Sequence, residues 1–275
     1  GAGAAVVGLD MVMSAPDLEP DADRLLAQSI SECNNVVLAR VSAAEGVDEI
    51  TPLGLFQEGM IGDGFIDVPL DQDGILRKIR FFNAKPLSDG SLQLLPSFAL
   101  ELSRLFLDLD FDFDFSGEDH FLMGKPDAKQ LRLPYPDLMI NYHGDYTAFT
   151  VVSFADVVSN TMNPEDLRDR SVLVGSTLSS QKDFFTTSFS RFHKGNAGLA
   201  GHFKTIDENI LGSDEPGVAC HAHAVETILR QAFIRHINGK AVIWLTAVLG
   251  LLGLIFYLPR VGMIMEVVIL LFMGA

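Results

Sequence analysis

The chain of 275 residues is long enough for one large α/β domain, and its 48% apolar and 20% charged residues exclude a disordered chain. The net charge is −16, and residues 1–234 alone carry 17 basic and 35 acidic side chains, a balance of −18. Such an acidic surface repels phosphate backbones and anionic headgroups, so we expect no nucleic-acid partner.

The start of the chain alternates strand and helix signals. Residues 4–9 form an apolar run typical of a buried strand, residues 21–33 have helical spacing, and residues 36–41 form the next expected strand. The apolar face of this helix carries Leu25, Leu26 and Ile30. A strand, a helix and a strand in close succession predict a parallel pair of strands with a right-handed crossover.

The same alternation continues through the rest of the chain. Pro96 suits a first helical turn, and Ser153 with Asp156 resembles a capping box. The further expected elements are strands at 75–82, 138–142 and 172–174 and helices at 96–106, 153–158 and 221–237. This order predicts an α/β fold over residues 1–235, with a mostly parallel sheet and flanking helices.

Residues 107–115 (LDLDFDFDF) alternate strictly between apolar and acidic side chains. In a strand, the aspartates line one face and the phenylalanines the other. Carboxylates suit calcium, but a calcium loop needs a sharp turn and ligands that converge from several directions. We therefore favour an edge strand whose charges prevent aggregation over a calcium site.

The C-terminal part predicts a membrane anchor. Ala241–Leu258 is an uncharged apolar run of 18 residues, which as a helix would be about 27 Å long, close to the thickness of a bilayer core. Trp244 and Tyr257 stand near its ends, where amphipathic rings favour the headgroup level. A buried core helix is the alternative interpretation.

A second apolar run favours the membrane interpretation. Pro259 and Arg260 form a polar break, and the run resumes over 261–275 with Glu266 as its one charge. We predict a transmembrane helical hairpin over 236–275, with helices at about 240–258 and 261–275, the second truncated. The flanking basic residues do not settle its orientation. The chain begins without Met and without a visible signal peptide, so we expect further sequence at both ends.

Catalytic motifs are missing from the sequence. It contains no Walker loop, G-x-S-x-G, H-E-x-x-H or C-x-x-C, so we expect neither an enzyme nor a cofactor in this chain. Cys33 and Cys220 permit at most one disulfide, and their pairing stays open. His221 and His223 are weak candidates for zinc, because helical positions two apart point in nearly opposite directions. A buried or capping role for His221 is favoured.

Five stretches in the same order resemble the type-two CHASE domain, a sensory module outside the membrane in bacterial cyclases and histidine kinases. They are Ala4–Asp10 with Asp23 and Leu25 after it, Asp67–Lys78 with Asp73, Gly74 and Arg77, Ile140–Gly144, Asp166–Ser176, and Gly217–Leu229. The resemblance implies an extracytoplasmic, periplasmic domain with about three membrane helices after it. A cyclase or kinase module would then follow in the cytoplasm, and the receptor would work as a homodimer.

The sequence also departs from that family in three places. Thr186 and Thr187 lack the proline that commonly follows there, His223 stands where the family more often has Asn, and residues 184–216 form a long insert rich in glycine and polar groups. The insert predicts a surface excursion that covers a pocket or contacts a partner.

The candidate ligand site lies where strands of an open sheet end. Asp10, Asn141 and Ser176 follow or end predicted strands, and Asp183 and His221 are expected at the same rim. Two carboxylates among donors and acceptors suit a polar or cationic small molecule. Alternatively, Asp10 and Asp183 have structural roles, as helix caps or as partners that hold the guanidinium of Arg77.

Three functions remain open. The favoured one is the sensor of a transmembrane receptor in the inner (plasma) membrane, with the lipid bilayer and a polar small molecule or an extracytoplasmic protein as partners. The second is a structural or interaction subunit of a membrane or cell-surface assembly without an output module. The third is an extracytoplasmic metal-dependent hydrolase that uses Asp183, His221 and His223.

Overall fold

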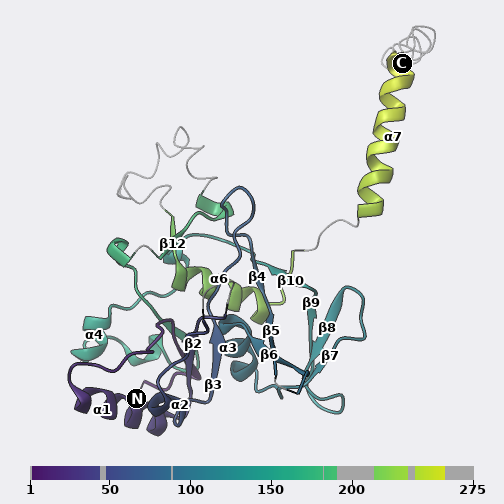
Figure 1. The fold of residues 1–275 in the computed structure, drawn as a ribbon. Helices are drawn as coiled ribbons and strands as arrows, with labels where there is room; N and C mark the ends of the chain where they lie inside the picture. The colour runs from purple at the N-terminus through teal and green to yellow at the C-terminus, as the bar shows by residue number, and fades with distance from the viewer. Residues whose placement is uncertain are drawn as a thin grey trace, which may run out of the picture. The chain divides into compact units, whose positions relative to one another are not determined.

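The computed structural model describes residues 2–43, 48–87, 89–181, 183–190, 214–234 and 239–257. The chain divides into two compact units, Gly1–Ile234 and Arg235–Ala275, and each is considered by itself. The first unit holds every strand of the described residues and the candidate site (Figure 1).

A parallel sheet in the order β11-β1-β2-β3 forms the centre of the first unit. Its strands are β1 (Val6–Leu9), β2 (Val36–Arg40), β3 (Gly62–Phe65) and β11 (Ser171–Val174). Val7 of β1 lies opposite Val36 on one side and Val172 on the other. The predicted parallel pairing of the first two strands is therefore confirmed.

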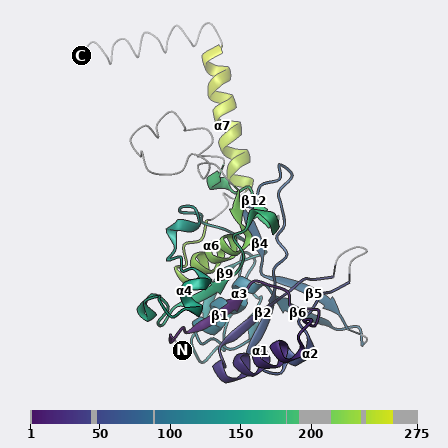
Figure 2. The ribbon, with the colours of Figure 1, turned by 90° about the vertical axis from the view of Figure 1, so that its left-hand side faces the viewer.

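Helices cover both faces of this sheet, because alternate side chains of β2 point in opposite directions. Val36 and Leu38 join one core cluster, with Ala27 and Ile30 of α1 (Pro20–Cys33) and Phe56 of α2 (Gly54–Gln57). Val37 and Ala39 join the larger cluster, to which α3 (Phe98–Phe106) and α6 (Gly217–Leu229) contribute. Figure 2 shows α1 and α2 on one side of β1 and β2 and α3 and α6 on the other.

The predicted apolar face of α1 is partly wrong. Ala27 and Ile30 are buried, whereas Leu25 is 66% exposed and Leu26 is 37% exposed. The helix meets the sheet through the narrow stripe at positions i and i+3, so the two leucines beside that stripe stay in solvent.

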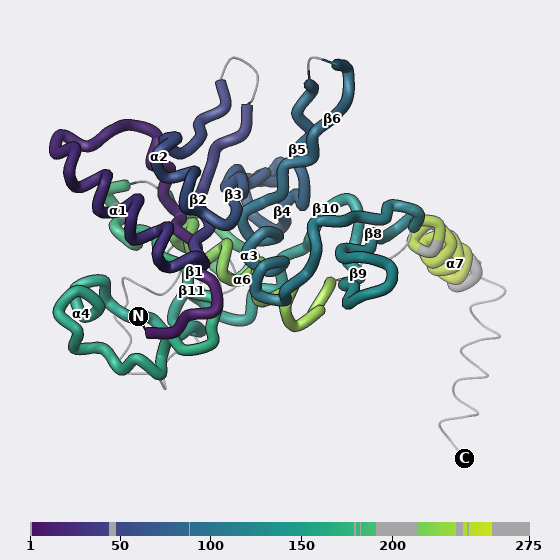
Figure 3. Tube along the Cα trace, turned by 90° about the horizontal axis from the view of Figure 1, so that it is seen from below, coloured from purple at the N-terminus to yellow at the C-terminus, as the bar shows by residue number. Residues whose placement is uncertain are grey.

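The other strand pairs of the described residues are antiparallel, so "mostly parallel" is right for the central sheet alone. These pairs involve β4 (Lys78–Arg80), β5 (Phe82–Pro86), β6 (Leu92–Pro96), β7 (Phe113–Asp114), β8 (His120–Met123), β9 (Leu131–Pro134), β10 (Asp137–Met139), β12 (Phe184–Phe185) and β13 (Glu215–Pro216). Short links such as the one between β5 and β6 permit only antiparallel pairing. Figure 3 shows β8, β9 and β10 away from α1 and α4 (Phe154–Val158).

Several predicted boundaries move in the structure. The strand expected at 75–82 is divided between β4 and the start of β5, because β4 pairs with β10 and β5 pairs with β6. Pro96 ends β6, and α3 begins after Ser97, whose hydroxyl accepts a hydrogen bond from Leu100 N. The cap predicted at Ser153 is confirmed, since its hydroxyl accepts from Ala155 N at the start of α4. Three short 3₁₀ turns complete this part, η1 (Tyr146–Ala148), η2 (Pro164–Asp166) and η3 (Ser179–Gln181).

Within the alternating segment 107–115, two residues form a strand, β7. This strand lies at the edge of the sheet β7-β8-β9. Asp108 has a positive φ of 54°, which turns the chain directly after α3. Asp110 pairs with Lys125 at 2.8 Å. This arrangement agrees with the edge-strand interpretation.

The helix predicted at 221–237 exists, but its bounds are shifted toward the N-terminus. It begins four residues earlier, at Gly217, and ends at Leu229, so it does not run directly into the apolar segment. Gln231 adopts a left-handed conformation with φ 53°, and Ala232 N donates to Thr227 O. A residue in the left-handed conformation just after the last turn is a common end of an α-helix. Glycine usually occupies this position, and because Gln231 occupies it here, the sequence does not mark the end of the helix.

The second unit contains α7 (Gly239–Tyr257). Over the residues that the structure describes, no helix combines the length and the apolar character needed to cross a membrane. The second predicted span, 261–275, and the centre of the long insert, 191–213, fall outside those residues. The transmembrane hairpin therefore stays a prediction.

Candidate functional site

The carboxyl edge of the parallel sheet is the starting point for the site. Strand β1 lies between β2 and β11 in the sheet. The chain continues from β1 to β2 on one side, and the much later strand β11 pairs with the other side of β1, so the strand order changes direction here. Ligands of open α/β sheets bind in the crevice at such a switch point. Asp10 directly follows β1, and its backbone N–H donates to Val174 O at 2.8 Å. Ser176 lies two residues past β11, and its hydroxyl accepts from Leu178 N at 3.2 Å. Both residues are therefore at this edge, as predicted.

The first turn of α6 brings Asp183 to the same region. Gly217, the first residue of α6, donates its backbone N–H to Asp183 O at 3.0 Å. The Asp183 carboxylate fills the space that a side chain at Gly217 would need, with Oδ1 2.7 Å from that position. Gly175, just past β11, packs against Val218 in the same way, its Cβ position 2.6 Å from Val218 Cβ. Two glycines thus allow the helix start to approach both the sheet edge and a carboxylate.

His221 lies on the next turn of α6. Its ring is buried and meets Phe98 of α3 edge-on, with 5.6 Å between the ring centroids. Its Nδ1 has no hydrogen-bond partner among the described residues. Burial raises the pKa of Asp10, an effect that the imidazole of His221 opposes and the carboxylate of Asp183 strengthens. These three side chains form what we call the acid–imidazole cluster: Asp10, Asp183 and His221.

Two further groups of this region were not predicted. Burial raises the pKa of the Cys220 thiol to about 12, an effect strengthened by the carboxylates of Glu215, Asp183 and Asp10. Burial, together with the charge of Asp145, also raises the pKa of Glu215 to about 7. Glu215 Oε2 accepts from Tyr146 N at 3.1 Å. No motif marks Glu215 or Cys220, because their role depends on neighbours far away in the sequence.

The two cysteines do not form a disulfide. Cys33 is exposed at the end of α1, whereas Cys220 is buried in α6, and both thiols are free. The pairing that the sequence left open is therefore absent.

Asn141 does not join the acid–imidazole cluster. Its backbone N–H donates to Thr227 Oγ1 at 3.0 Å, and its side-chain amide donates to Ala232 O at 3.2 Å. Both partners belong to the last turn of α6 or to the residues just after it. Asn141 therefore holds the C-terminal end of α6, the opposite end from Asp183.

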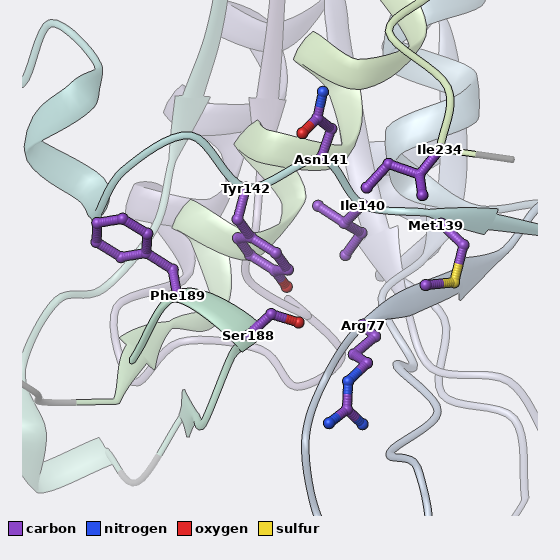
Figure 4. A pocket seen from close by; sticks show the side chains of 8 residues that line it. All are labelled: Arg77, Met139, Ile140, Asn141, Tyr142, Ser188, Phe189 and Ile234. Carbon is purple, nitrogen blue, oxygen red and sulfur yellow. The ribbon is translucent and has the colours of Figure 1, made fainter. Parts of the chain in front are cut away.

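A small pocket of about 260 Å³ lies beside Asn141 (Figure 4). It is lined by Arg77, Met139, Ile140, Asn141, Tyr142, Ser188, Phe189 and Ile234. The guanidinium of Arg77 is held by Asp71 and Asp73, each at 2.8 Å, and not by Asp10 or Asp183. In Figure 4 the side chain of Asn141 points away from Arg77 and Ser188. Arg77 and Asn141 thus already have partners within the protein.

His221 and His223 face different surroundings. His223 is fully buried, and its ring centroid lies 5.1 Å from that of Tyr142, 4.9 Å from that of His143 and 4.7 Å from that of Phe149. Burial and the neighbouring His143 lower its pKa to about 4. The two histidines thus face different neighbours, as the helical spacing predicted.

A different group of metal-ligating side chains surrounds His223. The candidate ligand atoms of His143, His223 and Glu226 all lie within 4.8 Å of one another. His143 Nε2 is 2.7 Å from Glu226 Oε2. Sequence reasoning missed His143 and Glu226, although His223 and Glu226 have the spacing i, i+3 that places two side chains on one helical face.

Comparison with known proteins identifies a family. The model of the CHASE2 domain family matches residues 1–262. No curated protein and no solved structure matches the chain.

Proposed function

Because the chain belongs to the CHASE2 domain family, whose members are extracytoplasmic sensory domains, we propose that it is the sensor of a transmembrane signalling receptor. Residues 1–235 lie in the periplasm and bind a ligand, and residues 236–275 enter the inner membrane. A cyclase or kinase module on the cytoplasmic side is the output, and the receptor works as a homodimer.

The acid–imidazole cluster is the observation that carries this proposal. His221 belongs to α6 itself, and Asp183 contacts the first residue of α6, so a ligand bound here acts directly on that helix. Two carboxylates in a partly desolvated place favour a ligand that brings positive charge or several hydrogen-bond donors. We therefore propose a small cationic or strongly hydrogen-bonding compound.

The position of α6 makes it a suitable transmitting element. It packs against α3 and β11, and Asn141 holds its far end through Thr227 and Ala232. Packed helices respond to ligands by small translations or rotations. A shift at the start of α6 would therefore reach Asn141 and the residues that lead to the C-terminal segment.

Membrane attachment rests on the apolar run 241–258. Its exposed side chains in α7 include Ile243, Trp244, Leu249 and Leu251. An apolar surface of this kind supports contact with lipid. Extraction of the native membrane fraction at high pH tests the attachment: an anchored chain stays with the lipid, and release into the supernatant contradicts it.

Binding is tested on the full chain in detergent micelles, by thermal unfolding with a panel of small amines, polyols and amino acids. We expect a compound from the cationic group to raise Tm. Asp183→Asn and His221→Gln should weaken its binding by tenfold or more, whereas Asp127→Asn, an exposed aspartate away from the cluster, should not. Unchanged binding in the cluster variants contradicts the proposal. So does a Tm far below that of the wild type without ligand, which would make these residues structural.

An assembly role without an output module is the second candidate, supported by the long insert 184–216. Peptide mapping of the native protein by mass spectrometry separates the two. A cyclase or kinase sequence after Ala275 favours the receptor, and a chain that stops soon after it favours the assembly subunit. The hydrolase has less support, because His221 and His223 contact different neighbours.

A further inference from the structure

We propose that His143, His223 and Glu226 form a binding site for a divalent transition metal, and that Zn²⁺ is the metal it prefers. The site joins α6 to the loop after β10. None of its residues belongs to the acid–imidazole cluster, so the metal proposal does not depend on the ligand proposed for that cluster.

The backbone places the three side chains together. His223 and Glu226 are three residues apart on α6 and share one of its faces. His143 comes from the loop after β10, and its Nε2 lies 2.7 Å from Glu226 Oε2. Nitrogen and oxygen ligands at about 2.0–2.1 Å from a tetrahedral zinc ion are about 3.3 Å apart. Small torsional changes of His143, whose side chain is 43% exposed, would bring the three ligand atoms, now within 4.8 Å of one another, to that spacing.

The state of His223 is an independent indication that a ligand belongs here. Its side chain is 0% exposed. The backbone of Gly144 lies near the ring, but neither ring nitrogen has a partner with full hydrogen-bond geometry among the described residues. A buried polar group without a partner destabilises the folded state, so such groups are rare unless a ligand uses them. A metal ion would take one of these nitrogens as its ligand.

The pair of His143 and Glu226 points the same way. Their closest atoms are 2.7 Å apart, yet Glu226 Oε2 has no partner with hydrogen-bond geometry among the described residues. This contact is shorter than the separation of about 3.3 Å between two ligands of a tetrahedral zinc ion, so the two side chains would move slightly apart when the metal binds. The contact shows that the two side chains already face each other at the proposed site.

The surroundings of the three residues resemble an outer coordination shell. His143 Nδ1 lies 3.5 Å from Asn141 O, which favours the tautomer that leaves Nε2 free for a metal. Arg230 Nε forms an ion pair with the other Glu226 oxygen at 2.7 Å and so helps to orient the carboxylate. The rings of Tyr142 and Phe149 enclose His223 on its apolar side. Outer partners of this kind fix the orientation of metal ligands.

The ligand types select the metal. Two imidazoles and one carboxylate suit zinc and its neighbours in the first transition row, whereas calcium and magnesium prefer oxygen ligands alone. Three protein ligands leave a fourth position for water or for a group from outside the chain. Bound zinc would tie the loop to α6 and thereby stabilise the folded state, since it binds that state alone.

The test is a zinc titration of the full chain in detergent, after treatment with chelator, with a chromophoric chelator as competitor. We expect one zinc ion per chain at this site. X-ray absorption should show nitrogen and oxygen neighbours at about 2.0–2.1 Å, including two imidazoles. His143→Ala and Glu226→Gln should weaken binding by more than the roughly 10- to 100-fold that loss of an outer-shell partner costs.

Two controls separate this site from other histidines. His120 lies 2.7 Å from Asp119, but among the described residues no second histidine joins this pair to complete a metal site. His120→Gln should therefore leave the affinity for zinc unchanged. The double variant His193→Gln/His202→Gln tests two histidines outside the described residues and should also bind zinc normally. The proposal is overturned if the chain binds no zinc, or if binding survives in both His143→Ala and Glu226→Gln. Circular dichroism of each variant excludes loss of fold as the cause.

Discussion

Two regions of the first unit are built on opposite principles. Around β5 to β9, the aromatic layer of Phe81, Phe82, Phe113, Phe115 and Phe121 packs ring against ring with centroids between 4.7 and 6.3 Å apart. Around α6, the surroundings hold buried or half-buried titratable groups instead: Asp10, Glu215, Cys220, His221 and His223.

This difference separates stability from function. Aromatic pairs add to the free energy of folding and need no partner beyond one another. Buried titratable groups oppose folding unless they are paired, and several around α6 lack a hydrogen-bond partner among the described residues. A fold tolerates such groups where ligands or ions bind, so α6 is the element where we expect binding.

The largest expected effect tests the aromatic layer. Phe121 is fully buried and touches four other phenylalanines, so Phe121→Ala should lower the free energy of unfolding by about 3–5 kcal/mol. Urea unfolding followed by circular dichroism measures the loss. Phe111→Ala is the control, because Phe111 is 48% exposed and its removal should cost under about 1 kcal/mol. Equal losses in the two variants would remove the distinction between the two regions.

The second prediction concerns Glu215 and pH. Its pKa is raised from 4.5 to about 7, so the folded state keeps a proton that the unfolded chain loses near pH 4.5. The stability due to this group is therefore fully present below pH 4.5 and is lost as pH rises to 7, a loss of about 3 kcal/mol. Glu215→Gln should remove this dependence and be the more stable protein at pH 8.

Urea unfolding of both proteins at pH 4.5, 6, 7 and 8 measures this difference. Glu118→Gln replaces an exposed glutamate and should leave the pH profile of the wild type unchanged. Parallel profiles for the wild type and Glu215→Gln would show that Glu215 is not desolvated in the folded state.

The third prediction tests how closely α3 approaches the parallel sheet. A Cβ on Gly64 of β3 would lie 2.5 Å from Phe98 Cα, a backbone atom that cannot move aside. Gly64→Ala should therefore cost about 1–3 kcal/mol through overpacking. Gly54→Ala is the matched control, since no atom lies within 4 Å of its Cβ position. If both variants unfold at the same urea concentration, α3 does not rest directly on β3.

The last prediction compares how fast the two cysteine thiols react with a thiol reagent, which requires no change to the fold. Cys33 is exposed, whereas Cys220 is buried and its pKa is raised to about 12. A thiol reagent at pH 8 should modify Cys33 at once and Cys220 only when urea unfolds the chain, because the thiolate is the reactive form. Mass spectrometry of tryptic peptides follows each site, with Cys33→Ser as the control. Rapid modification of Cys220 in the native protein would mean that α6 opens readily.

Much of the parallel sheet could be predicted from the sequence. The strands at Val6–Leu9, Val36–Arg40 and Ser171–Val174 are short, mostly apolar runs rich in valine, and these properties are local. The position of Asp10 and Ser176 at one edge followed from the rule that parallel strands end on the same side. The ligand-binding role of these residues and the division into a sensor and a membrane segment stay predictions.

The end of α6 and the antiparallel region could not be predicted in the same way. Gln231 takes the left-handed position in which glycine is usual, so the sequence carries no stop signal there. The segment 75–82 reads as one strand, yet Lys78–Arg80 and Phe82 pair with different strands. Pairing partners depend on how the whole chain packs, and a local pattern does not contain that information.

The sequence by itself determined which stretches are apolar and the family to which the chain belongs, because these features depend on neighbouring residues. The tertiary structure alone decided which side chains meet. It brought His143 to His223 and Glu226, some 80 positions away, and placed Glu215 beside Tyr146. Periodicity shows which face of an element is buried, but the contact between two faces is fixed only when both are packed into one core.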